Sequence, residues 1–98
     1  MTDAAWFDDR TEGAPPVLRE RVRAFFDHAP QESRPARLAA AGRSALHAAI
    51  AAGDDRGAAL DLLAADALIT LALLSHAEDD PLTLGTWAGT LRAQMVAA

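Results

Sequence analysis

The side chains most suited to catalysis or metal binding are three histidines and one aspartate. The aspartate lies inside an apolar segment. His28, His47 and His76 fall in three different predicted helices. None forms the His-x-x-x-His or Glu-x-x-His spacing that places two metal ligands on one helical face. The sequence contains no Cys, which excludes thiolate catalysis and sulfur ligands for zinc. We therefore expect no metal and no bound cofactor.

Hydrolytic chemistry needs a nucleophile beside a base, or two carboxylates held on either side of a cleft. Ser33, Ser44 and Ser75 lack the Gly-x-Ser-x-Gly surroundings of a nucleophile elbow. The six glycines are scattered along the chain and form no phosphate-binding loop. The sequence offers no catalytic constellation and predicts a protein that is not an enzyme.

The acid is Asp66, which with Thr70 interrupts the apolar run LLAADALITLALL of residues 62–74. A buried carboxylate must be paired, hydrogen-bonded or protonated. A helical hairpin turning at Gly53 would bring Arg43 within one turn of Asp66, and Thr70 lies four residues further on. We expect Asp66 to form a structural polar pair with Arg43 or Thr70.

Two alternatives stay open for this acid. Asp66 could line a cavity together with His47 and His76 and bind a small ligand or a metal. If the buried stripe of the helix is rotated from the expected one, Asp66 instead faces solvent.

The same segment is too short to cross a membrane. A membrane span needs about 20 consecutive apolar residues. The run has thirteen, contains Asp66, and is followed closely by Glu78, Asp79 and Asp80. We expect no membrane contact.

The elements that position these residues are predicted to be helices. The chain holds many Ala, the best helix former, but only two Ile and three Val, so the composition favours an all-α fold with closely packed helices. Proline, glycine and capping residues predict four helices, over about 15–28, 35–52, 54–78 and 81–98. Residues 1–14 are expected to form an irregular arm, and residues 15–98 a single up-down four-helix bundle domain.

The helix of residues 54–78 is apolar around most of its circumference. Such a helix is enclosed either by its own bundle or across a subunit interface. The sequence therefore predicts a homodimer or a protein partner. The candidate interface residues are Trp6 and Phe7 in the arm, and Leu84, Trp87 and Leu91 along the last helix. Alternatively, Trp6 and Phe7 fold back over the bundle, and Trp87 packs in the core.

The net charge of −5 disfavours nucleic-acid binding, which usually requires a dominant basic surface. The acidic first residues lack the apolar core of a secretion signal, so we expect a cytoplasmic protein. Abundant Ala and Arg without Lys, Asn or Tyr are typical of a GC-rich bacterial genome. Together these features predict a small helical interaction or regulatory module.

Overall fold

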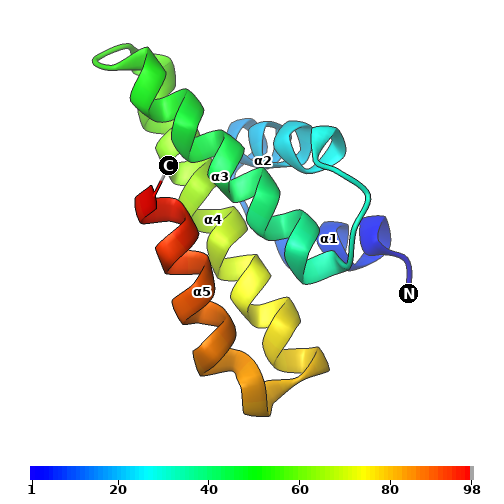
Figure 1. Ribbon diagram of the computed structural model, residues 1–98. Coiled ribbons are helices and arrows are strands. Elements are labelled where there is room, and N and C mark those ends of the chain that lie inside the picture. The colour runs from blue at the N-terminus through cyan, green and yellow to red at the C-terminus, as the bar shows by residue number, and fades with distance from the viewer. Residues whose placement is uncertain (98) are drawn as a thin grey trace.

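The structure is a computed structural model that describes residues 1–97 and the side chains of residues 1–96. Every regular element within that range is helical, which confirms the predicted all-α class (Figure 1). The elements are α1 (Asp3–Thr11), α2 (Pro16–His28), α3 (Arg34–Ala52), α4 (Arg56–Asp79), the 3-10 turn η1 (Pro81–Thr83) and α5 (Leu84–Ala97).

The ends of the helices follow from a few residues of suitable type. The side chain of Asp55 accepts a hydrogen bond from the Gly57 backbone N–H at 3.1 Å and caps α4. Prolines occupy the first turns of α2, α3 and η1, where a missing N–H costs nothing. Gly53 takes a positive φ of 63° at the turn between α3 and α4, a conformation that favours glycine.

The irregular arm expected over residues 1–14 is wrong for Asp3–Thr11, which form α1. Thr2 caps this helix by accepting a hydrogen bond from the Ala5 backbone N–H at 3.1 Å. A nine-residue helix is marginal on its own, so tertiary contacts must hold it. Trp6 and Phe7 supply them, because both are buried.

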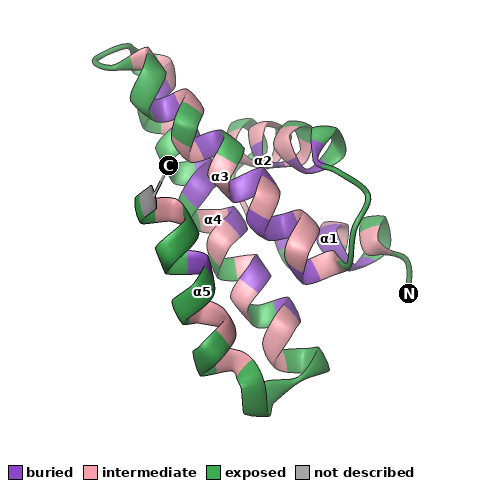
Figure 2. Ribbon diagram, in the orientation of Figure 1, coloured by how far each residue is buried: buried purple, intermediate pink, exposed green. Residues whose placement is uncertain are grey.

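The core lies where α3 and α4 pack side by side through small residues. Most of the buried residues along this seam are alanines: Ala39, Ala41 and Ala45 of α3, and Ala64, Ala65 and Ala72 of α4. A methyl group added to Gly42 would lie 2.6 Å from Ile69 Cδ1 and 3.4 Å from the Ile69 backbone nitrogen, so the Ile69 side chain packs directly on Gly42. Figure 2 shows the buried residues running along this seam and on towards α1 and α2.

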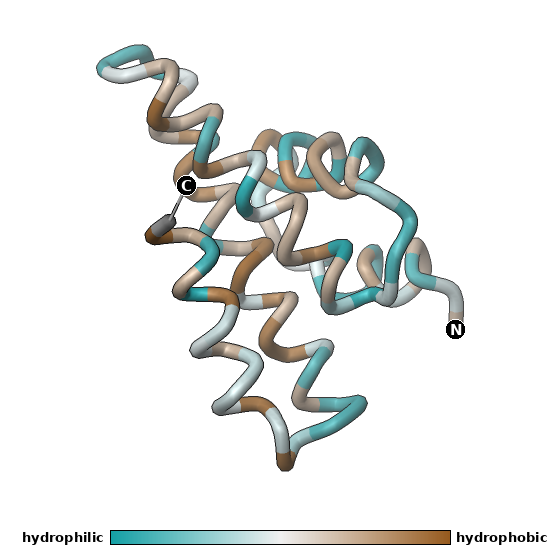
Figure 3. Tube along the Cα trace, viewed as in Figure 1, coloured by the Kyte–Doolittle hydropathy of each residue, from teal (hydrophilic) through white to brown (hydrophobic). Residues whose placement is uncertain are grey.

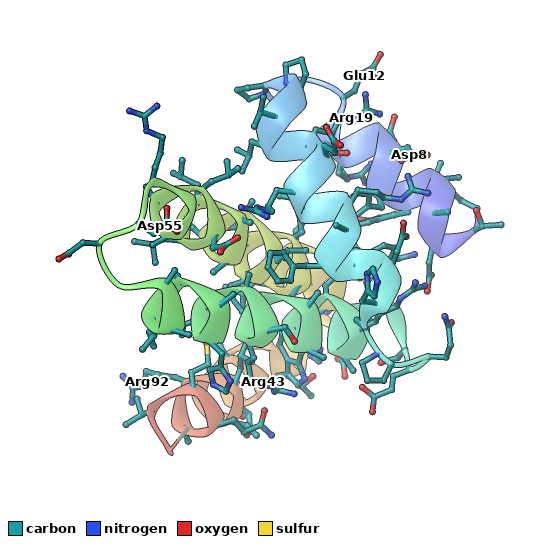
Figure 4. All side chains as sticks on the ribbon, turned by 90° about the horizontal axis from the view of Figure 1, so that it is seen from above. Asp8, Glu12, Arg19, Arg43, Asp55 and Arg92 are labelled. Carbon is teal, nitrogen blue, oxygen red and sulfur yellow. The ribbon has the colours of Figure 1, made fainter. Side chains whose placement is uncertain are left out.

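The other helices are arranged around this hairpin. α3, α4 and α5 alternate in direction, and their axes are roughly aligned, whereas α2 crosses α3 steeply (Figures 1 and 4). The turn at Gly53 projects beyond the rest of the molecule (Figure 1). α4 packs against α3, α2 and α5. One side of α4 has no helix packed against it.

Phe7 is the side chain whose loss should test the docking of α1 most simply. It is fully buried, and its ring stacks on that of Phe26 at 4.6 Å between centroids. We expect Phe7→Ala to lower the free energy of unfolding by about 3–5 kcal/mol, the usual cost of emptying a buried phenylalanine site. Urea unfolding followed by circular dichroism would measure it, with the 66% exposed Val17→Ala as the control. A loss below about 1 kcal/mol would contradict this docking.

Candidate functional site

α4 turns its small residues inward and several leucines outward. The buried residues of α4 are Ala58, Asp61, Ala64, Ala65, Leu68, Ala72 and Ser75. On the opposite side, Ala59, Leu63, Asp66, Thr70 and Leu74 are exposed and follow one another at spacings of three or four. Residues at such spacings share one face of a helix. We call these five residues the outer face of α4.

Three of the five residues of this outer face are apolar, and the rest of the chain leaves them uncovered. Leu63 is 55% exposed and Leu74 is 41% exposed. α4 is long and apolar enough, by length and composition alone, to pass as a membrane span, yet only 33% of its most apolar 18-residue window is buried inside the chain. The apolar residues continue along most of α4 (Figure 3).

A shallow groove runs along one edge of the outer face, between α4 and the pair α1–α2. It encloses about 270 Å³. Leu18, Val22, Ala67 and Leu71 form its apolar lining, and Arg10, Arg19, Asp66 and Thr70 are its polar lining. The outer face and the groove together form a continuous, mainly apolar surface with a single acid near its middle.

The predicted polar pair at Asp66 is wrong. The carboxylate is exposed, and the Thr70 hydroxyl donates to the Asp66 backbone carbonyl at 2.8 Å rather than to the side chain. Arg43 donates instead to Gln94 Oε1 at 2.6 Å, and Figure 4 shows it beside α5. The buried stripe of α4 is rotated from the expected one: it consists mainly of alanines, with Asp61 and Leu68, and leaves Asp66 outside.

The buried acid of α4 is Asp61, and its partner is Arg21 of α2. Arg21 Nε lies 3.0 Å from Asp61 Oδ1, and the Asp61 side chain is 10% exposed. These two atoms form an ion pair without the alignment of a hydrogen bond. A signal for it existed in the sequence, because Asp61 shares the helical stripe of Ala58, Ala65 and Ala72.

The predicted ligand or metal site at Asp66, His47 and His76 is wrong, because the structure does not bring these residues together. His47 is exposed and lines a groove with Leu46 and Ile50 of α3 and Met95 of α5. His76 stacks on Trp87 at 4.5 Å between ring centroids, and its Nε2 lies 2.9 Å from the Thr83 hydroxyl. Within residues 1–96, no group of three or more His, Asp and Glu side chains could hold a metal ion.

The aromatic pair of α1, predicted as a candidate interface, is buried within its own chain. Two guanidinium groups lie over the Trp6 ring, with Arg34 4.6 Å and Arg10 5.1 Å from its centre. Its indole N–H donates to Glu78 Oε1 at 3.1 Å, which ties α1 to the end of α4. Trp6 and Phe7 therefore fold back over the helices, and neither is available to anchor a neighbour.

The interface candidates of α5 are also partly used inside the chain. Leu91 is buried, whereas Leu84 and Trp87 are half-buried. Trp87 is held by its stacking on His76. The surface that sequence reasoning missed is the outer face of α4, although the apolar circumference of that helix was the signal for it.

Glu78 is a charged anchor between α1 and α4. The hydrogen bond from Trp6 lowers the pKa of its carboxyl below the ordinary value of 4.5, and the neighbouring Arg10 acts in the same direction. Arg10 Nη2 lies 3.1 Å from Glu78 Oε2. Both interactions favour the ionised carboxylate.

Comparison with known proteins adds no relative. No family model, no curated protein and no solved structure matches this chain. The features that bear on function are therefore the outer face of α4 and the adjoining groove.

Removing Asp61 and removing Asp66 should have different consequences for stability. We expect Asp61→Ala to cost about 1–3 kcal/mol of unfolding free energy, less than for a fully buried pair because Arg21 is 39% exposed. Asp66→Ala is the matched control on the same helix, and we expect a change within about 0.5 kcal/mol. Both are measured by urea unfolding at one low protein concentration, because self-association would add to stability. The reverse order would contradict the orientation of α4.

Replacing Glu78 should weaken the acid sensitivity of the fold. A carboxyl whose pKa is lowered by folding stabilises the native state above its unfolded pKa, and this contribution is lost as the pH falls through the folded value. Glu78→Gln keeps an oxygen for the Trp6 N–H but loses the charge. We expect the variant to have a lower Tm than the wild type at pH 7 and a smaller fall in Tm between about pH 5 and pH 3. Equal falls in the two proteins would contradict the anchor.

Proposed function

We propose that this chain is a non-enzymatic helical interaction module that self-associates through the outer face of α4. The observation that carries the proposal is the exposure of Leu63 and Leu74 on a helix whose opposite side is the core of the molecule. A contiguous apolar surface on a small protein is the usual mark of an interaction site.

The length of α4 is compatible with self-association. A stable interface of ordinary size buries about 800 Å² on each partner, about one seventh of this chain's 5849 Å² of accessible surface. α4 has 24 residues and is about 36 Å long, so its outer face with the adjoining groove offers enough length for such an interface.

The charge distribution favours a protein over a lipid bilayer as the partner. Asp66 sits in the middle of the outer face, and a charge at that position is costly in hydrocarbon. Within residues 1–96, α4 also carries the Asp61–Arg21 ion pair that fixes it against α2. A protein surface can offer polar partners to the Asp66 carboxylate, which hydrocarbon cannot.

A charge placed on the outer face should abolish self-association. We expect the wild type to sediment as a dimer at tens of micromolar and Leu63→Glu to sediment as a monomer, because the variant would bury unpaired carboxylates in the interface. Leu82→Glu is the matched control, because Leu82 is 96% exposed but lies in η1, away from the outer face. It should remain a dimer.

Analytical ultracentrifugation over a range of concentrations would measure the masses, and circular dichroism would show that both variants keep their helical content. A wild type that is monomeric throughout would overturn the proposal. So would flotation of the wild type, but not of Leu63→Glu, with phosphatidylcholine vesicles, because the outer face would then be a membrane-binding surface.

A further inference from the structure

Two hollows lie between α3 and α5, and none of the described residues that line them belongs to α4. The first encloses about 190 Å³ and is mainly polar, with Arg43 and Gln94 in its lining. The second encloses about 340 Å³ and is mainly apolar, with Leu46, Ile50 and Met95 in its lining. We call the two hollows together the α3–α5 groove.

Arg43 lies where the two hollows adjoin. It belongs to the polar hollow, whereas Leu46 and His47, about one turn further along α3, belong to the apolar one. On α5, the consecutive residues Gln94 and Met95 divide in the same way. Figure 4 shows Arg43 beside α5. The groove therefore has a cationic group at the border between its polar and its apolar part.

Arg43 can bind an anion without losing an ion pair. It is half-buried, and its Nη1 donates to the neutral Gln94 amide at 2.6 Å. Among the side chains that the structure describes, Arg43 has no acidic partner. A guanidinium group carries five N–H donors in a planar arrangement that suits the two oxygens of a carboxylate. The polar side of the border is thus suited to a carboxylate.

The apolar hollow is suited to an alkyl chain. Ile50 is 71% exposed, and Leu46 and Met95 are half-buried, so a ligand there would cover hydrocarbon that the chain leaves open to water. No acid is among the described residues that line this hollow. α3 rises about 12 Å from Arg43 to Ala51, which matches the length of a medium-chain alkyl tail.

We propose that the α3–α5 groove binds a free medium-chain fatty acid, with the carboxylate on Arg43 and the alkyl chain along Leu46 and Ile50. Glu32 favours this direction, because it lines the polar hollow about three helical turns before Arg43 and would repel a carboxylate there. His47 is a further side chain of the groove that can donate a hydrogen bond to the anion. The site involves neither the outer face of α4 nor a second copy.

Calorimetric titration at pH 7 with octanoate, hexanoate and octanol tests both ends of the ligand. We expect octanoate to bind saturably, with one molecule per chain. Hexanoate should bind about two- to fourfold more weakly for each methylene removed, because burial of a methylene strengthens binding by up to about fourfold. Octanol keeps the tail without the charge and should bind at least about tenfold more weakly than octanoate.

Substitutions separate the two parts of the site. Arg43→Gln should weaken octanoate binding at least about tenfold and leave octanol binding unchanged, whereas Arg43→Lys keeps the charge and should bind octanoate more tightly than Arg43→Gln. Ile50→Glu should weaken the binding of both ligands. Arg92→Gln is the matched control, because Arg92 is an exposed arginine of α5 outside the lining of both hollows, and it should bind octanoate like the wild type. Circular dichroism would show that each variant keeps its helical content.

A wild type without saturable octanoate binding would overturn this proposal, as would equal affinities for octanoate and octanol. So would an octanoate affinity that Arg43→Gln leaves unchanged. If Ile50→Glu made a dimeric protein monomeric and Leu63→Glu did not, the groove would be an interface between copies, and both proposals would be overturned. A monomeric wild type that binds octanoate as expected would overturn the proposed function alone.

Discussion

The close approach of α3 and α4 is the constraint on which the rest of the structure depends. The Ile69 side chain packs directly on Gly42, and alanines occupy most of the remaining seam. Helices that pack this closely must place small residues between them. Leu68 is the leucine of α4 that lies in the core, and Leu63 and Leu74 are left on the outside. The apolar outer face is a direct consequence of the way the core is packed.

Arginine side chains on α2 and α3 hold α1 in place and complete the fold. Arg34 of α3 lies over the Trp6 ring, Arg23 of α2 lies over the Phe7 ring, and Arg37 of α3 lies over Phe26, on which Phe7 stacks. Guanidinium groups over aromatic rings contribute about 0.5–2 kcal/mol each, depending on burial. A short acidic helix is thereby fixed to the Arg-rich middle of the chain. Acidic residues of α1 thus lie beside arginines of α2, as in the ion pair of Asp8 with Arg23. α1 is thereby covered, and α4 keeps the free surface.

The helical class and the four helices α2, α3, α4 and α5 could be predicted from the sequence because proline, glycine and alanine act locally, although residues 81–83 form a 3-10 turn before α5. The helix Asp3–Thr11 could not, since its stability comes from the burial of Trp6 and Phe7 against residues distant in the chain. The candidate site failed for a related reason. The leucines around Asp66 predict a buried position for it. The distance between α3 and α4, which cannot be read from a short stretch of sequence, instead buries the mainly alanine side of α4. Asp61 on that side is the acid that needed a partner.

The central claim is that Leu63 and Leu74 face solvent in one copy of the chain and are covered when two copies meet. Carbene footprinting at a series of protein concentrations tests it most directly, because it labels exposed side chains regardless of their chemistry. Labelling of Leu63 and Leu74 should be strong at low concentration and fall at least about fivefold on dimerisation, while the 96% exposed Leu82 stays fully labelled. Labelling of Leu63 and Leu74 that stays constant across the transition from monomer to dimer would contradict the account.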